Sequence, residues 1–127
     1  MLVDDSIVRG TTSKKIVELV RRAGALSVTF LSTCPPIRYP CFYGIDFPES
    51  NELLAAGRTE DEIAKLIGAD AVIYLDTKAL TDALSVVSKG KVTNPCTACL
   101  TGEYPTDVCE STRFAAERKV ERGEQSV

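Results

Sequence analysis

The apolar residues of this chain fall into short continuous runs that alternate with stretches of helical spacing. Runs at residues 1–3, 27–31 and 71–75 have the length and the apolar content of buried strands. Between them, residues 13–23 and 59–67 carry apolar side chains three and four positions apart, which is the spacing of a helix with one buried face. Strands joined through a helix pair in parallel, so the pattern predicts an α/β fold, a parallel sheet with flanking helices.

Polar residues mark the expected starts of the helices. Thr59 and Glu62 have the spacing of a capping box, in which each side chain binds the other residue's backbone N–H. Ser50 predicts the start of a short helix over residues 52–56, and Thr77 is expected to cap a further helix.

A long loop is expected at residues 34–46, where three prolines exclude a helix. Its aromatic and apolar residues favour an ordered, functional loop over a disordered one. Arg38 and Tyr39 lie in this loop near the expected carboxyl edge of the sheet, where α/β folds bind ligands. These two residues are expected either to contact a phosphate or nucleotide or to pack the loop.

The composition limits the classes of protein to which the chain can belong. Its 127 residues suffice for one modest domain, and the formal net charge of −3 gives no basic surface for nucleic acid. No apolar stretch approaches the roughly 18 residues of a membrane span, and the first residues show no signal-peptide pattern. We therefore expect a cytoplasmic protein with no nucleic-acid and no membrane partner. The chain has no histidine, which excludes an imidazole base or metal ligand within it.

The most specific chemical motif follows the first expected strand. Asp4 and Asp5 end that strand, and a loop rich in hydroxyl groups leads directly into the first helix. Backbone N–H groups, hydroxyls and the positive end of a helix dipole converge on an anion at such a junction. Carboxylates beside it suit sugar hydroxyls or hydrated Mg²⁺, so the motif predicts a ligand with both a sugar and a phosphate. An ordinary strand-to-helix turn is the alternative. The loop residues expected to bind the ligand are Ser6, Arg9, Gly10, Thr11 and Thr12.

Five cysteines form the second chemical signal. Cys96 and Cys99 are spaced as CxxC, which occurs in redox, zinc and iron–sulfur sites. Cys41 lies in the proline-rich loop, far away in the sequence. In a cytosolic protein this set favours metal or cluster binding over disulfides. Cys34 and Cys109 are expected to be bystanders.

Residues 3–12, VDDSIVRGTT, resemble the phosphoribosyl pyrophosphate motif of type I phosphoribosyltransferases, and most closely that of the amidophosphoribosyltransferase family. The resemblance implies that Asp4 and Asp5 bind the ribose hydroxyls and the associated Mg²⁺. It implies that the loop from Ser6 to Thr12 binds the 5-phosphate. The fold expected from it is a partial type I phosphoribosyltransferase fold with a Cys-rich C-terminal extension.

The cysteine segments resemble the same family. Residues 39–45 and 96–106 are similar to two segments that hold a [4Fe–4S] cluster in many of its members. The resemblance implies cluster ligands at Cys41, Cys96 and Cys99, with the fourth ligand upstream and therefore missing from this chain.

Three parts of the chain are expected from these motifs. Residues 1–90 would be the C-terminal part of a phosphoribosyltransferase domain, residues 91–109 a cluster-binding segment, and residues 110–127 a charged, flexible tail.

The family implies an activity as well. Its enzymes transfer glutamine-derived ammonia to phosphoribosyl pyrophosphate, which gives phosphoribosylamine in the first committed step of purine synthesis. The resemblance thus implies these substrates, purine nucleotides as regulators and a homo-oligomeric parent enzyme. Leu2 follows Met1, so the family's N-terminal cysteine is missing, and we expect a C-terminal fragment that is inactive and marginally folded by itself. The alternatives are another type I phosphoribosyltransferase that acts on a free base, and a non-catalytic Cys-rich metal-binding module.

Overall fold

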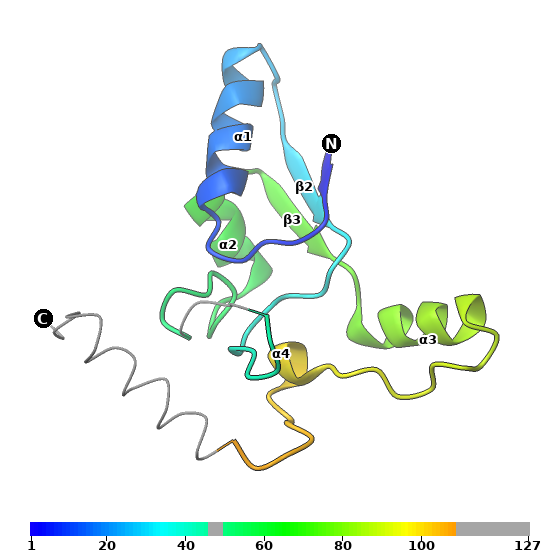
Figure 1. Cartoon of the computed structure of the whole chain (residues 1–127). Coiled ribbons are helices and arrows are strands. Elements are labelled where there is room, and N and C mark those ends of the chain that lie inside the picture. The colour runs from blue at the N-terminus through cyan, green and yellow to red at the C-terminus, as the bar shows by residue number, and fades with distance from the viewer. Residues whose placement is uncertain (46–49, 109–127) are drawn as a thin grey trace, which may run out of the picture.

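The computed structural model of the chain describes residues 1–45 and 50–108 (Figure 1). Its sheet has three short parallel strands in the order β1-β2-β3, which are β1 (Leu2–Asp4), β2 (Thr29–Ser32) and β3 (Ala71–Tyr74). Helix α1 (Thr11–Arg22) connects the first two strands, and α2 (Glu60–Ile67) precedes the third. The predicted α/β fold with a parallel sheet and flanking helices is therefore confirmed.

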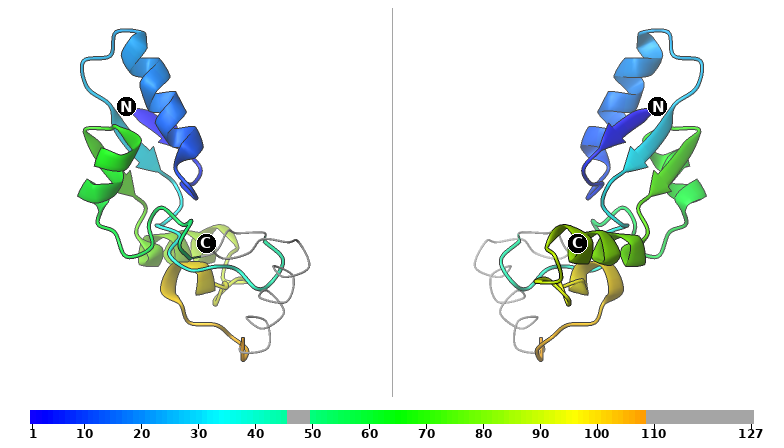
Figure 2. Two further views of the ribbon diagram at one scale, coloured as in Figure 1. Left: turned by 90° about the vertical axis from the view of Figure 1, so that its left-hand side faces the viewer. Right: turned by 90° about the vertical axis from the view of Figure 1, so that its right-hand side faces the viewer.

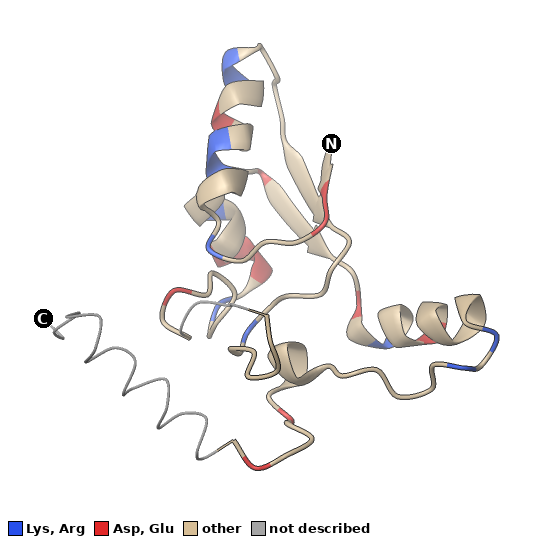
Figure 3. Ribbon diagram, in the orientation of Figure 1, with Lys and Arg blue, Asp and Glu red and all other residues tan. Residues whose placement is uncertain are grey.

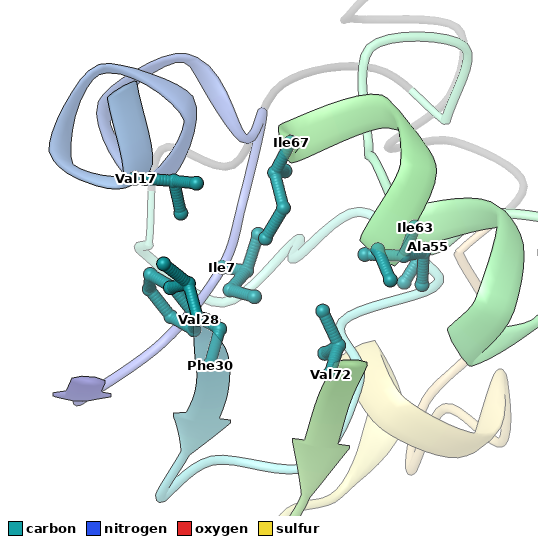
Figure 4. Close-up of a cluster of buried hydrophobic side chains, with 9 residues drawn as sticks. Ile7, Val17, Val28, Phe30, Ala55, Ile63, Ile67 and Val72 are labelled. Atoms are coloured by element: carbon teal, nitrogen blue, oxygen red, sulfur yellow. The ribbon is translucent and has the colours of Figure 1, made fainter. Parts of the chain in front are cut away.

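Helices α1 and α2 cover one face of the sheet and bury a hydrophobic core against it (Figures 2 and 4). Leu2, Phe30 and Val72 stand side by side in the strand register and face this core. Ile7 also belongs to the core and is 1% exposed, although it lies in the loop after β1. The core therefore holds the loop that carries the acidic and hydroxyl motif. Its buried members are Ile7, Val17, Val28, Phe30, Ala55, Ile63, Ala64, Ile67 and Val72.

The other face of the sheet carries a second apolar row. Val3, Leu31 and Ile73 are register partners that alternate with the core residues along the three strands. Val3 is 60% exposed and Ile73 is 48% exposed, and the strands face the viewer with the two helices behind them in one view of Figure 2. Because parallel sheets in globular proteins are normally covered on both faces, this row is apolar surface that a complete α/β layer would bury.

The second helix begins and ends as its sequence predicts. The Thr59 side chain accepts from the backbone N–H of Glu62, and the Glu62 carboxylate accepts from the backbone N–H of Thr59 at 2.8 Å, which confirms the capping box. Gly68 ends the helix in the left-handed conformation at φ 79°. The next helix, α3 (Thr77–Val87), is capped one residue earlier than predicted, because the Asp76 carboxylate accepts from Ala79 N at 3.0 Å.

Residues 52–56 do not form the predicted helix and instead lie in consecutive turns. Two arginines bind carbonyl oxygens of this segment and hold it in turns. Nη1 of Arg58 donates to the Leu54 carbonyl at 3.0 Å, and Nη1 of Arg38 donates to the Ala55 carbonyl at 2.9 Å. The segment is thus shaped by side chains that the local pattern does not include.

The chain beyond β3 packs loosely in the described structure. Helix α3 projects away from the sheet (Figure 1), and none of its residues is buried. The four-residue helix α4 (Ala98–Thr101) lies beside the proline-rich loop, since the Cys99 carbonyl accepts from the N–H groups of Arg38 and Tyr39, both at 3.0 Å. This contact brings the two cysteine-bearing segments together.

A carboxylate joins the start of β2 to the start of β3. Oδ2 of Asp70 accepts from Val28 N at 2.6 Å and from Nη2 of Arg21 at 2.8 Å. The hydrogen bond from the Val28 backbone is the main cause that lowers the pKa of Asp70, and the Arg21 guanidinium adds to it. Ionised Asp70 therefore stabilises the junction of α1, β2 and β3.

We expect Asp70→Asn to remove an acid-sensitive part of the stability. Because the folded pKa is lowered, the ionised group contributes stability that is fully present above the unfolded pKa of about 4 and is lost as the pH falls through the folded pKa. Urea unfolding at pH 7 and at pH 3 should show a smaller loss on acidification in the variant than in the wild type. Glu18→Gln, on the exposed side of α1, is the control, and an unchanged acid loss in Asp70→Asn would contradict the assignment.

Candidate functional site

A cavity of about 310 Å³ lies at the carboxyl end of β1, where the chain turns into α1. Open α/β sheets bind ligands at this edge, outside the carboxyl ends of the strands. The structure therefore brings together the acidic pair and the loop residues that the sequence singled out. The residues that line the cavity are Asp4, Asp5, Ser6, Val8, Arg9, Gly10, Thr11, Thr12 and Ser13.

The N-terminus of α1 faces this cavity without a side-chain cap. Gly10 occupies the N-cap position in the left-handed conformation at φ 76°, and the first helical bond runs from Lys14 N to the Gly10 carbonyl at 2.9 Å. The first N–H groups of a helix have no partner within the helix, and here they belong to Thr11, Thr12 and Ser13. No acidic residue lies in this first turn, so the helix dipole presents an uncompensated positive end to an anion.

Asp4 and Asp5 each use one carboxylate oxygen to order the backbone. Oδ1 of Asp4 accepts from Asp5 N at 3.0 Å, and Oδ1 of Asp5 accepts from Ser6 N at 2.6 Å. The Asp4 carbonyl accepts from Thr33 N at 3.0 Å, which ties the acidic pair to the end of β2. The carboxylates are thus fixed beside the cavity, and carboxylate oxygens are suitable partners for sugar hydroxyls or for a hard cation such as Mg²⁺.

Arg9 lines the cavity but pairs with a carboxylate outside the motif. Its Nε lies 3.0 Å from Oε2 of Glu52, and about half of each side chain is exposed. Such a surface pair contributes little to stability, so an anionic ligand can compete for this guanidinium. Figure 3 colours further basic positions along the ribbon of α1, and this helix carries the exposed residues Lys14 and Lys15 in its first turns.

Leu54 is a contact of the loop that sequence reasoning missed. Its backbone N–H donates to the Val8 carbonyl at 2.8 Å. A Cβ atom added to Gly10 would lie 2.6 Å from Cδ2 of Leu54. No local signal reveals this contact, because it joins positions more than forty residues apart in the sequence.

The cysteines gather at the corner between the proline-rich loop and α4. Burial raises the pKa of the Cys99 thiol, and its neighbours Cys41, Cys34 and Cys96 raise it further. The backbone N–H of Tyr43 donates to the sulfur of Cys41 at 3.4 Å. The donors are therefore of the right chemistry, but within residues 1–45 and 50–108 no three such side chains are arranged to hold a metal ion. Cys109 lies outside the described residues.

Aromatic side chains join the same two segments. The Tyr104 hydroxyl donates to the Pro40 carbonyl at 2.7 Å, and the rings of Phe42 and Tyr104 lie 5.1 Å apart. The Tyr39 ring packs on Gly102, where an added Cβ would lie 2.9 Å from Cζ of the ring. The Arg38 guanidinium points to the backbone of the 53–58 segment, so both Arg38 and Tyr39 pack the loop in this structure.

Comparison with known proteins defines the relationship of this chain. No protein-family profile matches it. The amidophosphoribosyltransferase of Methanocaldococcus jannaschii is 50% identical over 108 residues, which are 85% of this chain and 22% of the relative. That of Haemophilus influenzae is 52% identical over 106 residues, which are 84% of this chain and 21% of the relative.

Two solved structures share the fold. The glutamine phosphoribosylpyrophosphate amidotransferase of Bacillus subtilis, complexed with ADP and GMP, matches with a TM-score of 0.73 and 44% identity over 84% of this chain and 23% of its own. A structure of the allosteric regulatory enzyme of purine biosynthesis matches with a TM-score of 0.75 and 44% identity, over 87% of this chain and 24% of its own.

An acidic pair, a hydroxyl-rich loop and a helix N-terminus at the carboxyl edge of a parallel sheet define part of a type I phosphoribosyltransferase fold. Within that class, the chain belongs to the amidophosphoribosyltransferase family. It spans about a fifth to a quarter of the length of the relatives it matches. Within the described residues, no helix is long and apolar enough to cross a membrane.

We expect Gly10→Ala to destabilise the loop more than Gly90→Ala does. Both glycines have φ 76°, so both variants carry the left-handed strain of about 1–2 kcal/mol. Only at Gly10 does the new methyl group meet Leu54, whereas nothing lies within 4 Å of it at Gly90. Overpacking should add about 1–3 kcal/mol to the loss in unfolding free energy, which chemical denaturation measures. Equal losses in the two variants would show that the Leu54 contact does not constrain the loop.

Proposed function

We propose that this chain supplies the ribose- and 5-phosphate-binding part of an amidophosphoribosyltransferase that acts on phosphoribosyl pyrophosphate. The observation that carries the proposal is the uncapped N-terminus of α1, which faces the same cavity as the carboxylates of Asp4 and Asp5. An uncapped helix N-terminus is suited to a phosphate, and a fixed carboxylate pair is suited to the two ribose hydroxyls. The similarity to enzymes named amidophosphoribosyltransferase supports this substrate over other sugar phosphates.

In the proposed reaction, the chain acts by binding and orientation. The N–H groups of Thr11, Thr12 and Ser13, with the hydroxyls of the loop, hold the 5-phosphate at one end of the substrate. Asp4 and Asp5 hold the ribose hydroxyls and thereby fix the position of C1. Ammonia derived from glutamine then forms a bond to C1 while the bond from C1 to the pyrophosphate oxygen breaks. Holding the sugar at both positions uses binding energy to offset part of the entropic cost of reaching the transition state.

The carboxylate pair is also the proposed site of Mg²⁺. Asp4 and Asp5 would hold the ion together with the substrate oxygens, because oxygen ligands of this kind suit Mg²⁺. When bound, the ion supplies positive charge that stabilises the departing pyrophosphate.

We further propose that Cys41, Cys96 and Cys99 bind a [4Fe–4S] cluster with a fourth thiolate that this chain does not supply. The mutual proximity of the thiols around Cys99 supports the proposal, as does the Tyr43 N–H that donates to the Cys41 sulfur. Within residues 1–45 and 50–108 the thiols are not arranged as a group of three that could hold a metal ion, so the proposal rests on their chemistry and their proximity.

The proposed organisation keeps the three parts expected from the sequence. Residues 1–90 bind substrate and contribute Cys41 to the cluster, and residues 91–109 supply Cys96 and Cys99. Residues 109–127, which include the predicted charged, flexible tail at 110–127, lie outside the described structure. The complex of the Bacillus subtilis relative with ADP and GMP supports purine nucleotides as regulators. A cytoplasmic location and a homo-oligomeric parent enzyme remain predictions. The similarity to amidotransferases over both cysteine segments favours this function over a free-base phosphoribosyltransferase or a non-catalytic metal-binding module.

The carboxylate pair can be tested in a hybrid enzyme in which residues 1–108 replace the matching segment of the Bacillus subtilis relative. We expect Asp5→Asn to lower phosphoribosylamine synthesis by about a hundredfold or more, because a misplaced substrate loses most of the benefit of orientation. Glutamine hydrolysis should continue at a basal rate. Asp82→Asn, on the exposed face of α3, is the control variant. Synthesis at the normal rate in Asp5→Asn would refute the assignment of the acidic pair.

The cluster can be tested in the same hybrid protein, purified without oxygen. We expect about four irons and four sulfides per chain, as a four-cysteine cluster requires. Cys41→Ser, Cys96→Ser and Cys99→Ser should each lose iron and sulfide, whereas Cys34→Ser should keep them. Stoichiometric zinc without sulfide would overturn the proposal.

A further inference from the structure

The turns at residues 53–58 are held by a guanidinium from another segment. Nη1 of Arg38 donates to the carbonyls of Ala55 and Arg58, at 2.9 and 3.1 Å. Arg38 is partly buried, and Leu53 and Ala55 in these turns are 0% exposed. Hydrogen bonds from a charged group to carbonyls in such surroundings are stronger than those between neutral groups. The position of these turns therefore depends on Arg38, in addition to Arg58 within the segment.

The same turns support the phosphate loop, which is the loop from Ser6 to Thr12. The Leu54 N–H donates to the Val8 carbonyl at 2.8 Å, and the Leu54 side chain packs on Gly10. One residue before this segment begins, Glu52 pairs with Arg9 at 3.0 Å. The loop is thus contacted from this side at three consecutive residues. A hydrogen bond reaches Val8, an ion pair reaches Arg9 and a packing contact reaches Gly10.

The backbone of Arg38 is held by the segment that contains α4. The N–H groups of Arg38 and Tyr39 both donate to the Cys99 carbonyl at 3.0 Å. The Tyr39 ring is held against Gly102, and the Tyr104 hydroxyl donates to the Pro40 carbonyl. The main chain of Arg38 is therefore hydrogen-bonded to the cysteine segment, residues 96–106, and its side chain is hydrogen-bonded to the turns that contact the phosphate loop.

We propose that Arg38 is a positioning residue for the phosphate loop, and that it makes the geometry of the loop depend on how the cysteine segment is packed. The inference rests on the proposed function for its substrate, although the contacts themselves do not. A displacement of α4 moves the main chain at Arg38, the guanidinium carries the movement to the Ala55 and Arg58 carbonyls, and Leu54 passes it to Val8. The N–H groups of α1 that bind the phosphate begin at Thr11, directly after Gly10.

Amide hydrogen exchange on the 127-residue chain tests the mechanical part directly. The reporters are the N–H groups of Leu54 and Lys14, which bond to Val8 and Gly10, and the reference is Leu31 in the central strand. Arg38→Met keeps the apolar stem and removes the donors, so protection of both reporters should fall about tenfold relative to Leu31, as expected for the loss of charged hydrogen bonds. Arg38→Lys should recover part of it. Arg22→Met, at the exposed end of α1, is the control.

A second pair of variants tests whether the effect originates at the cysteine segment. Gly102→Ala drives a methyl group into the Tyr39 ring, whereas Gly90→Ala carries similar left-handed strain with nothing within 4 Å. Gly102→Ala should lower protection of Leu54 and Lys14 relative to Leu31, and Gly90→Ala should not. In the double variant with Arg38→Met, Gly102→Ala should have no further effect, because the connection has already been removed.

Enzyme kinetics test the proposed function, whereas amide hydrogen exchange tests the role of Arg38, so the two proposals can fail independently. In the hybrid enzyme, Arg38→Met should raise KM for phosphoribosyl pyrophosphate about tenfold, with a partial recovery in Arg38→Lys. If the wild-type hybrid does not use phosphoribosyl pyrophosphate, the proposed function fails, and the exchange data still decide the role of Arg38. If Arg38→Met lowers protection of Leu54, Lys14 and Leu31 equally, or leaves the first two unchanged, the positioning role is wrong. Additive effects of Arg38→Met and Gly102→Ala would refute the connection to the cysteine segment.

Discussion

The left-handed turn at Gly10 is the constraint on which the candidate site depends. It ends the loop after β1 and places the N-terminus of α1 against the cavity beside Asp4 and Asp5. Any side chain at this position would both strain the backbone and collide with Leu54. Since Gly10 has no side chain to cap the helix, the same residue leaves the first N–H groups of α1 open to an anion. Gly10 therefore determines both the position of the helix N-terminus and its availability to an anion.

The loop is held from two sides, which suits a site that must keep its shape. Ile7 fixes its near side in the core formed by α1, α2 and the sheet (Figure 4). The turns at residues 53–58 fix its far side through Leu54, and Arg38 connects these turns to the segment that bears Cys99. A site built in this way can orient a substrate without the motion of long side chains, which is what a reaction controlled by orientation requires.

The parts of the structure that were predicted from the sequence are those determined by neighbouring residues. The acidic pair, the hydroxyl-rich loop and the helix after it are contiguous, and the capping box joins Thr59 to Glu62 only three residues later, so local patterns sufficed. The turns at residues 52–56 were predicted as a helix because the pattern of residues 50–56 includes neither Arg38, which reaches the Ala55 carbonyl from the proline-rich loop, nor Arg58, which binds the Leu54 carbonyl. The cap of α3 was misplaced by one residue because Asp76 and Thr77 are both good caps and only the backbone conformation decides between them. Contacts such as those of Leu54 with Val8 and of Arg38 with Ala55 follow from no periodicity and emerge only when the segments are packed.

The most direct test of the account is a crystal structure of the full chain with bound ribose 5-phosphate. The account predicts that the phosphate oxygens lie within hydrogen-bond distance of the N–H groups of Thr11, Thr12 and Ser13, and that the ribose hydroxyls contact the carboxylates of Asp4 and Asp5. A phosphate bound elsewhere, or a sugar that does not contact the acidic pair, would contradict it.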